Sequence, residues 1–314
     1  MSRYRDAVLF AVLAALWGSA FMAIKAGLEF FPPVLFAAVR YDLAGVLMLA
    51  YAWHVLDDPV PRGRGQWALV AIGSVLLIAV YHALLFVGQT DPGVTSAVAA
   101  VIVSLSPVLT TGFARLLLPS DRLTTAGIAG LLLGLVGVVV LSQPDPDALL
   151  SGGFVAKLLV LGATAAFALG SVLTKRIDAE MPIESMEAWS MLGGALLMHA
   201  VSVGLGEPIR GVEWTEPAAL AALLYLAIGS SAVGFLIYFT LLDRLGAIQI
   251  NLVSYVAPVF AALSGWLFLA EELRPATAAG FLLIFVGFLL IKREAIRGEL
   301  PRIRGGLRAL FLRN

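Results

Sequence analysis

The sequence predicts an all-α integral membrane protein with ten transmembrane helices, arranged as two inverted repeats of five helices each. Hydrophobic residues make up 60% of its 314 residues and charged residues only 13%, whereas about a quarter of the residues are charged in soluble domains. The mean hydropathy is +0.95. Apolar runs of about 20 residues, the length that crosses a bilayer as a helix, recur along the chain. The second half of the chain also repeats the pattern of the first half.

The repeat is clearest between residues 97–141 and 251–292, which both hold two spans joined by a short polar turn. Residues 117–141 align with the later segment at a shift of 150 positions. Identical pairs at that shift include Leu123 and Leu273, Gly130 and Gly280, and Gly137 and Gly287. The duplication therefore governs the fold.

Ten spans can be drawn in order along the chain: roughly 7–27, 34–53, 66–87, 94–117, 124–141, 154–174, 186–205, 217–241, 248–269 and 275–292. The first span is interpreted as an uncleaved helix and not a signal peptide, because its apolar run continues to Lys25 and belongs to the repeat.

Residues 142–153, which are rich in proline, aspartate and glycine, form the clear break in the middle of the chain. We expect a first repeat at 7–141, this linker, a second repeat at 154–292 and a basic cytoplasmic tail at 293–314. An odd number of spans per repeat means that the second copy enters the membrane upside down, as in many secondary transporters.

Loop charges predict the orientation. Lysine and arginine concentrate in the loops on one side, whereas the other side has Arg210 and Arg274. By the positive-inside rule both termini are expected in the cytoplasm. The tail interleaves apolar and basic residues, so either a helix lying on the anionic leaflet or a disordered segment fits it.

Two prolines, Pro107 and Pro258, lie inside apolar runs at equivalent places of the repeats. A proline in a helix frees the carbonyl four residues earlier, and such a carbonyl is tolerated at membrane depth where it lines a cavity. The helical faces around them predict walls of a central substrate site, formed by Ser104, Pro107 and Thr111 and by Asn251, Ser254, Tyr255 and Pro258. Hydrogen bonds between neighbouring helices are the alternative role for these polar residues.

Other amphipathic side chains suit a site for a small, partly polar organic molecule. They are Trp17 and Ser19 in the first span, Tyr81 and His82 in the third, and Ser230 and Tyr238 in the eighth. Tryptophan and tyrosine can also anchor a helix at the membrane surface.

Arg40 and Asp42 are charged residues well inside the second span. Charges at this depth are costly unless paired or hydrated, which makes them functional candidates. Two positions apart on a helix, they need different partners. Arg40 is expected to have a structural role, and Asp42 is the candidate for carrying a coupled proton.

Motifs for ATP binding and for zinc binding are absent from the sequence, so no cofactor and no metal are expected. The expected partners are a small-molecule substrate and the lipid bilayer, and no nucleic acid. Glycines line one face of the fifth span and recur at Gly280 and Gly287 in the tenth. Such faces serve close helix packing or a homodimer.

The sequence resembles the EamA-type transporters of the drug/metabolite transporter superfamily across residues 7–292. The motifs that carry the resemblance are L-W-G-S-A-F at 16–21, R-Y-D-L-A-G at 40–45, S-L-S-P-V at 104–108, and V-A-P-V-F-A-A-L-S-G-W-L-F-L-A-E-E-L at 256–273. The resemblance implies a carrier of the plasma (inner) membrane that exports small metabolites or drugs by alternating access. Asp42, Tyr81 and His82 depart from the general motif and could tune substrate or coupling.

Two alternatives stay open. A passive channel for small organic solutes would have the same composition. An intramembrane enzyme would need Ser230 or Ser231 as nucleophile with His82 or His199 as base, but no recognised nucleophile motif surrounds these serines.

Overall fold

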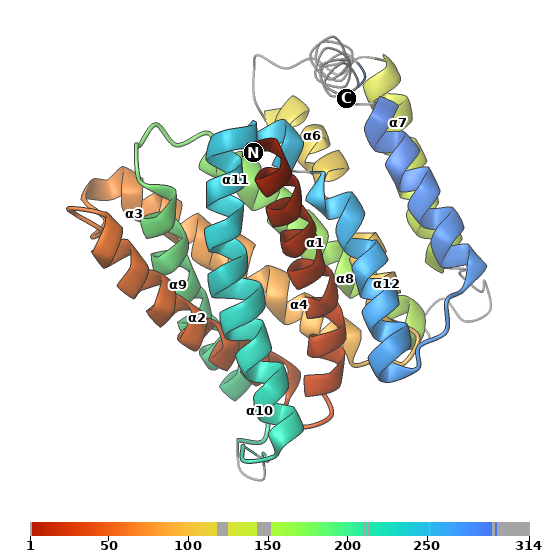
Figure 1. The fold of residues 1–314 in the computed structure, drawn as a ribbon, viewed down its shortest axis with the longest axis horizontal. Helices are drawn as coiled ribbons and strands as arrows, with labels where there is room; N and C mark the ends of the chain where they lie inside the picture. Colours follow the sequence, from red (N-terminus) through yellow and green to blue (C-terminus); the bar gives the residue numbers. More distant parts are fainter. Residues whose placement is uncertain are drawn as a thin grey trace.

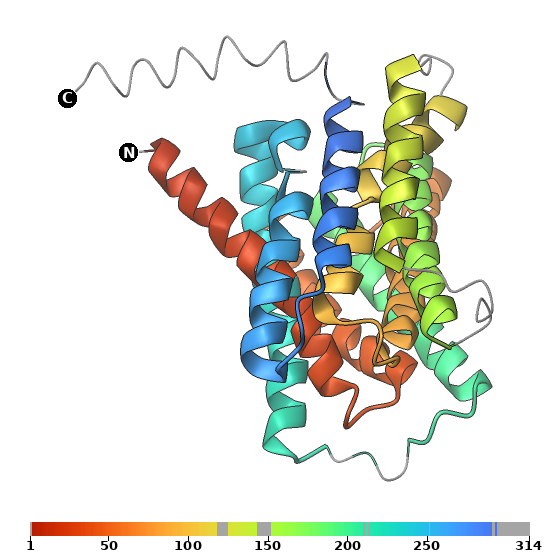
Figure 2. The ribbon, with the colours of Figure 1, turned by 90° about the vertical axis from the view of Figure 1, so that its right-hand side faces the viewer.

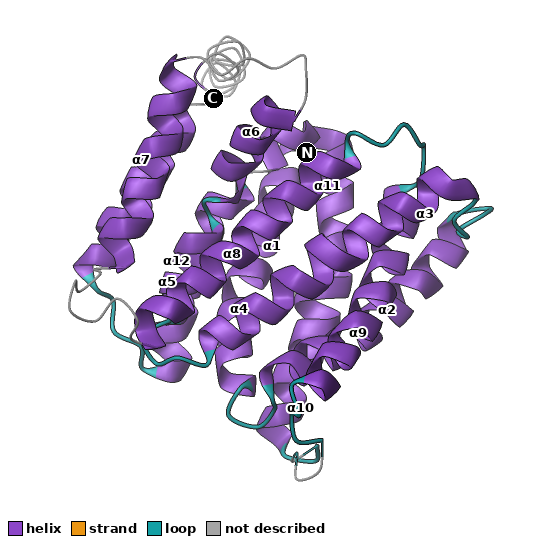
Figure 3. Cartoon of the chain, turned by 180° about the vertical axis from the view of Figure 1, so that it is seen from behind, coloured by secondary structure: helices purple, strands orange, loops and turns teal. Residues whose placement is uncertain are grey.

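The computed structural model describes residues 2–117, 125–142, 152–209, 212, 214–250, 252–290 and 293. Figure 3 shows helices joined by loops, with no strand among the described residues. Apolar spans favour helices because a helix satisfies its own backbone hydrogen bonds within the bilayer. The all-α prediction is confirmed.

The first repeat supplies five spans. These are α1 (Ser2–Gly27), α2 (Pro33–Val55), a third span made of α3 (Gly63–Ile72), η1 (Gly73–Val80) and α4 (Tyr81–Gln89), a fourth made of α5 (Ser96–Val103) and α6 (Ser106–Leu117), and α7 (Thr125–Ser142).

The second repeat supplies five more. These are α8 (Gly152–Thr174), α9 (Ile183–Gly204), an eighth span made of α10 (Pro217–Leu224), η3 (Tyr225–Val233) and α11 (Gly234–Ile250), then α12 (Val253–Leu269), and a last helix, Pro275–Leu290. The predicted plan of ten helices in two five-helix repeats is confirmed. The eighth span extends beyond its predicted end at residue 241, because α11 continues as a helix to Ile250.

Helices of the first repeat pack against helices of the second, and one of these pairs, α2 and α9, joins equivalent helices. α2 lies along α9, α1 lies along α12, and α8 lies against α4 and α6. Figures 1 and 2 show the helices running between two ends of the molecule. We call the end with the loops at 56–62 and 175–182 the basic end, and the end with the loops at 28–32, 90–95, 205–209 and 270–274 the acidic end.

The third and eighth spans depart from regular helix at matching places. Each changes to π-helical turns, η1 and η3, near its middle. π-Helical turns are rare within α-helices and often occur at functional sites. The two repeats therefore share one irregularity in the centre of the bundle.

The two prolines, Pro107 and Pro258, occupy different positions in their helices. Pro107 is the second residue of α6, after a turn at residues 104–105 that separates α5 from α6. A proline there removes no helical hydrogen bond, because the first N–H groups of a helix have no partner within it. Pro258 instead lies inside a continuous α12. Only the first of the two proline-containing spans is divided into two helices.

Glycines bring α7 and the last helix close together. A Cβ placed on Gly137 would lie 2.7 Å from the carbonyl oxygen of Gly280, and one placed on Gly287 would lie 2.5 Å from the carbonyl oxygen of Gly130. The small-residue faces of the fifth and tenth spans thus pack against each other within the chain, as their equivalent positions suggested.

Large apolar side chains also cover the outside of the bundle, for example Leu196 at 69% exposure and Phe268 at 67%. Such surfaces are normal for helices that face lipid tails. Among the described residues, six helices are long and apolar enough to cross a membrane on their own, and three shorter helices are apolar.

Candidate functional site

Arg40 is the charged residue at the centre of the bundle. It lies about 10 Å along α2 from its start, by helical rise, and its side chain is only 6% exposed. Its Nε donates to the Ser231 hydroxyl at 3.2 Å, and Nη2 donates to the Ser230 and Ser231 hydroxyls, both at 3.1 Å. The two serines belong to η3, so Arg40 joins the first repeat to the second.

Tyr41 and His82 extend this polar cluster. The His82 Nδ1–H donates to the carbonyl of Ile78 at 2.9 Å, since a carbonyl oxygen can only accept. In the neutral ring, Nε2 therefore accepts from the Tyr41 hydroxyl, which lies 2.7 Å away. The Tyr41 ring lies under the Arg40 guanidinium, 5.0 Å from its carbon. Tyr81 packs edge-on against His82.

Aromatic residues from α1 and the eighth span form one wall of this cluster. The Trp17 indole N–H donates to the carbonyl of Ser230 at 3.1 Å, and its ring lies 5.3 Å from that of Tyr238. The Ser19 hydroxyl lies 2.6 Å from the Tyr225 hydroxyl. The structure thus brings the six amphipathic candidates for substrate binding close to Arg40, for which the sequence predicted a structural role. These six are Trp17, Ser19, Tyr81, His82, Ser230 and Tyr238.

Glu187 belongs to the same region, although the sequence did not single it out. It stands on the buried face of α9, one turn before Met191 and two before Gly194. It lies within electrostatic range of Tyr41 on α2 and of Tyr238 on α11. Tyr41, Tyr225 and Glu187 are therefore additions to the predicted site.

The residues around the prolines lie on other helices. The Ser104 hydroxyl donates to Val101 O and the Thr111 hydroxyl to Pro107 O, both on their own span. On α12, Ser254 is half-buried and Pro258 is buried. α12 packs against α1 and α5, whereas Pro107 and Thr111 stand on α6, which packs against α8 and α7. Asn251 lies outside the described residues. A substrate site between these faces stays a prediction.

Tyr255 is the buried member of that second group. Its ring lies 4.5 Å from Phe288 and 5.5 Å from Phe285 on the last helix. Its hydroxyl is buried and has no hydrogen-bond partner in the structure. The residue thus packs α12 onto the last helix.

Asp42 points away from Arg40. Its carboxylate lies 2.6 Å from His199 Nε2 on α9, and both side chains are about half-buried, at 41% and 36% exposure. Arg40 and Asp42 therefore have the separate partners that their spacing required. The proton-coupling role of Asp42 stays a prediction.

Carboxylates from the second repeat bind helix starts of the first repeat at the acidic end. Glu271 accepts from the backbone N–H and the hydroxyl of Ser96 at the start of α5, at 3.0 Å. Glu207 accepts from the N–H groups of Val34 and Leu35 at the start of α2, at 3.0 and 2.8 Å. A helix N-terminus favours such a negative charge. These contacts tie the repeats together at this end.

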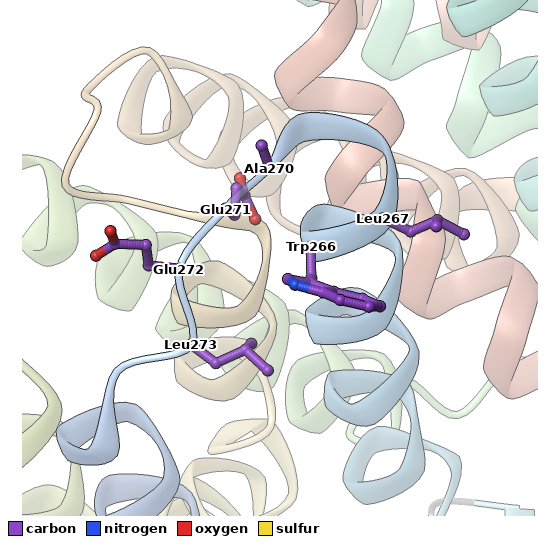
Figure 4. Close-up of a pocket in the computed structure, with 6 residues that line it drawn as sticks. All are labelled: Trp266, Leu267, Ala270, Glu271, Glu272 and Leu273. Atoms are coloured by element: carbon purple, nitrogen blue, oxygen red, sulfur yellow. The ribbon is translucent and has the colours of Figure 1, made fainter.

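A surface recess of about 650 Å³ adjoins Glu271. Figure 4 shows Trp266 and Leu273 on one side of this turn and the Glu272 carboxylate pointing to the other side. The Glu271 carboxylate is already used by Ser96. The recess is thus part of a helix cap at the molecular surface and is separate from the Arg40 cluster.

The pairings required by the enzyme alternative differ from those observed. Ser230 and Ser231 accept from Arg40, His82 bonds Tyr41 and Ile78, and His199 bonds Asp42. Within the described ranges no group of three acidic, histidine or cysteine side chains is placed to hold a metal ion.

Relatives of the chain are named as transporters. It is 32% identical to the uncharacterized inner membrane transporter YedA of Escherichia coli K12, over 84% of each chain. It is 28% identical to the uncharacterized transporter YvbV of Bacillus subtilis, over 94% of each chain. A crystal structure with a TM-score of 0.64, 24% identical, covers 94% of this chain and 99% of its own, and shows the same fold.

The model of the EamA-like transporter family matches the chain twice, at residues 6–143 and 155–293. The two matches together cover most of the chain, and each holds one five-helix repeat. The chain therefore belongs to the EamA-like transporter family and is a multi-pass membrane transporter.

Proposed function

We propose that this protein is a secondary transporter that exports small metabolites or drugs by alternating access, with substrate bound in the centre of the bundle. The observation that carries the proposal is the contact of Arg40, in the first repeat, with Ser230 and Ser231, in the second. A site built by both inverted repeats can be reached from either side when the repeats rock against each other.

Other features support such movement. η1 and η3 place irregular helix in both repeats at the level of this cluster. Sharp bends of helices often occur at π-helical turns, so these segments are candidate hinges. Outward transport is the direction that the resemblance to the drug/metabolite transporters implies.

We place the protein in the plasma (inner) membrane with both termini in the cytoplasm. The basic residues of the 56–64 and 175–182 segments support this orientation, since cytoplasmic loops carry the excess of lysine and arginine. In this orientation the carboxylate caps by Glu207 and Glu271 lie on the outer side.

Counterflow in proteoliposomes tests the carrier mechanism. A ligand would first be found by a thermal-shift screen of purified protein against metabolite pools, because a ligand at 100 times its dissociation constant adds about 2.7 kcal/mol to stability. Vesicles preloaded with that ligand unlabelled should take up the labelled ligand faster than empty vesicles. Uptake that does not depend on the internal ligand would indicate a passive channel instead.

A further inference from the structure

Arg40 is a buried cation on α2. No carboxylate in the described part of the chain lies within salt-bridge distance of its guanidinium. Its observed acceptors are the hydroxyls of Ser230 and Ser231, which are neutral. Hydroxyls fix the direction of a guanidinium but leave its charge uncompensated. A charge at membrane depth is costly in that state, so the site favours an anion.

The guanidinium is also held in place from both repeats. Two serines of η3 fix one edge, and the Tyr41 ring lies 5.0 Å from the guanidinium carbon. Tyr41 is fixed in turn by its bond to His82. The fork of an arginine matches the two oxygens of a carboxylate, and a fixed fork loses little freedom on binding.

An apolar wall lies beside the cation. Trp17 donates to the carbonyl of Ser230, the residue whose hydroxyl Arg40 contacts. The Trp17 ring packs against Phe235 and Tyr238, at 5.8 and 5.3 Å between ring centres. A ligand with one charged group and one apolar body matches this arrangement.

We propose that Arg40 binds the carboxylate of a small organic acid whose apolar or aromatic body lies against Trp17, Phe235 and Tyr238, so that organic monoanions are the substrate class. This inference rests on the proposed transport function and adds the identity of the substrate's charged group. Glu187 lies within electrostatic range of Tyr41 and Tyr238. In either protonation state this carboxyl group offers no cation to pair with a second carboxylate on the ligand.

Matched pairs of ligands test the proposal on purified full-length protein. The probes are benzoate, phenylacetate and hexanoate, each beside its uncharged amide, with phenylsuccinate as a dianion. Affinities come from the rise of the unfolding temperature with ligand concentration. We expect at least one acid to bind the wild type about 10- to 100-fold more tightly than its amide, since a charge-assisted hydrogen bond is lost with the amide. Phenylsuccinate should bind more weakly than phenylacetate.

Arginine variants test whether the preference for the acid over the amide depends on Arg40. Arg40→Gln should abolish the difference between acid and amide, whereas Arg62→Gln, at an exposed loop position, should keep it. Arg40→Lys retains the charge without the fork, so it should still prefer the acid but with a weaker affinity. That variant keeps the test open if Arg40→Gln does not insert correctly.

Several results would overturn the inference. They are equal affinity for acid and amide in every pair, binding of none of the acids, or an acid preference that survives in Arg40→Gln. Sodium chloride and sodium phosphate at equal ionic strength should not replace the organic acid, and competition by these salts would show a simple anion site. Exchange of labelled phenylacetate in proteoliposomes separates this result from the proposed function. Selective binding without exchange would contradict transport alone, and exchange of acid and amide at equal rates would contradict the substrate class alone.

Discussion

Arg40 and Asp42 stand two positions apart on α2 and have different surroundings. Arg40 lies inside the bundle among Ser230, Ser231 and Tyr41, whereas Asp42 bonds His199 on the half-buried outer side of α2 and α9. Successive helical positions point about 100° apart, so the pair could not share one site. At the scale of residues, the structure thus separates Arg40, the candidate for binding the charged group of the substrate, from Asp42, the candidate for proton coupling.

Proton coupling is predicted to depend on Asp42. Its carboxylate lies 2.6 Å from Nε2 of His199 on α9, so a proton can pass between the two side chains. Asp42→Asn should abolish transport driven by a pH gradient and leave counterflow intact. Both rates are measured in proteoliposomes with the ligand identified by thermal shift.

Glu187→Gln is the comparison variant for that experiment, because it also removes a carboxyl group inside a span and tests Glu187 as the other candidate for coupling. If Glu187→Gln abolishes the pH-driven rate and Asp42→Asn does not, the coupling residue is Glu187. Transport that is insensitive to the gradient in the wild type would show that the carrier is not proton-coupled.

At the scale of helices, the sequence predicted the spans well because their apolar length is a property of each segment alone. The π-helical turns of η1 and η3 were not predicted, since their residues are as apolar and helix-forming as their neighbours. Glu187 falls in the first turns of its predicted span, where a charge ordinarily reaches the membrane surface, and only the packing of α9 against α2 turns it inward. In contrast, the equivalent positions of Gly137 and Gly287 could be predicted, because they follow from the alignment of the two repeats.

The contact between α7 and the last helix gives a stability prediction. Gly287→Ala should destabilise the protein by about 1–3 kcal/mol, the usual cost of overpacking, because its Cβ would lie 2.5 Å from the carbonyl oxygen of Gly130. Gly204→Ala is the matched control, since nothing lies within 4 Å of its added Cβ. Thermal unfolding in detergent compares the two. An unchanged unfolding temperature in Gly287→Ala would show that the two helices can move apart enough to admit the methyl group.

Homodimer formation stays a prediction. The molecular mass of the wild-type protein in the same detergent tests it.

At the scale of the whole molecule, the inverted repeats make the two ends of the bundle related but chemically different. Glu207, from the loop after α9, caps the start of α2, and the carbonyl of Pro59, after α2, accepts from Ser185 and Trp189 at the start of α9. The same pair of helices is thus tied at both ends, with a carboxylate at the acidic end and a backbone carbonyl at the basic end. Arg62, Lys175 and Arg176 lie in the described loops of the basic end and Arg274 in those of the acidic end, and this excess predicts that the basic end faces the cytoplasm.

The orientation is tested by labelling single cysteines in this cysteine-free chain. Asp91→Cys and Glu272→Cys, in loops of the acidic end, should react with a membrane-impermeant maleimide added to intact cells. Arg62→Cys and Asp178→Cys, in exposed loops of the basic end, should react only after the cells are opened. The reason is that translocating a loop rich in lysine and arginine is unfavourable, whereas Asp91 and Glu272 stand in loops with few basic residues. Each variant serves as a control for the others, because all four positions are in loops that connect spans. Labelling of Arg62→Cys in intact cells, with Asp91→Cys protected, would contradict the predicted orientation. The Glu207 and Glu271 caps would then face the cytoplasm.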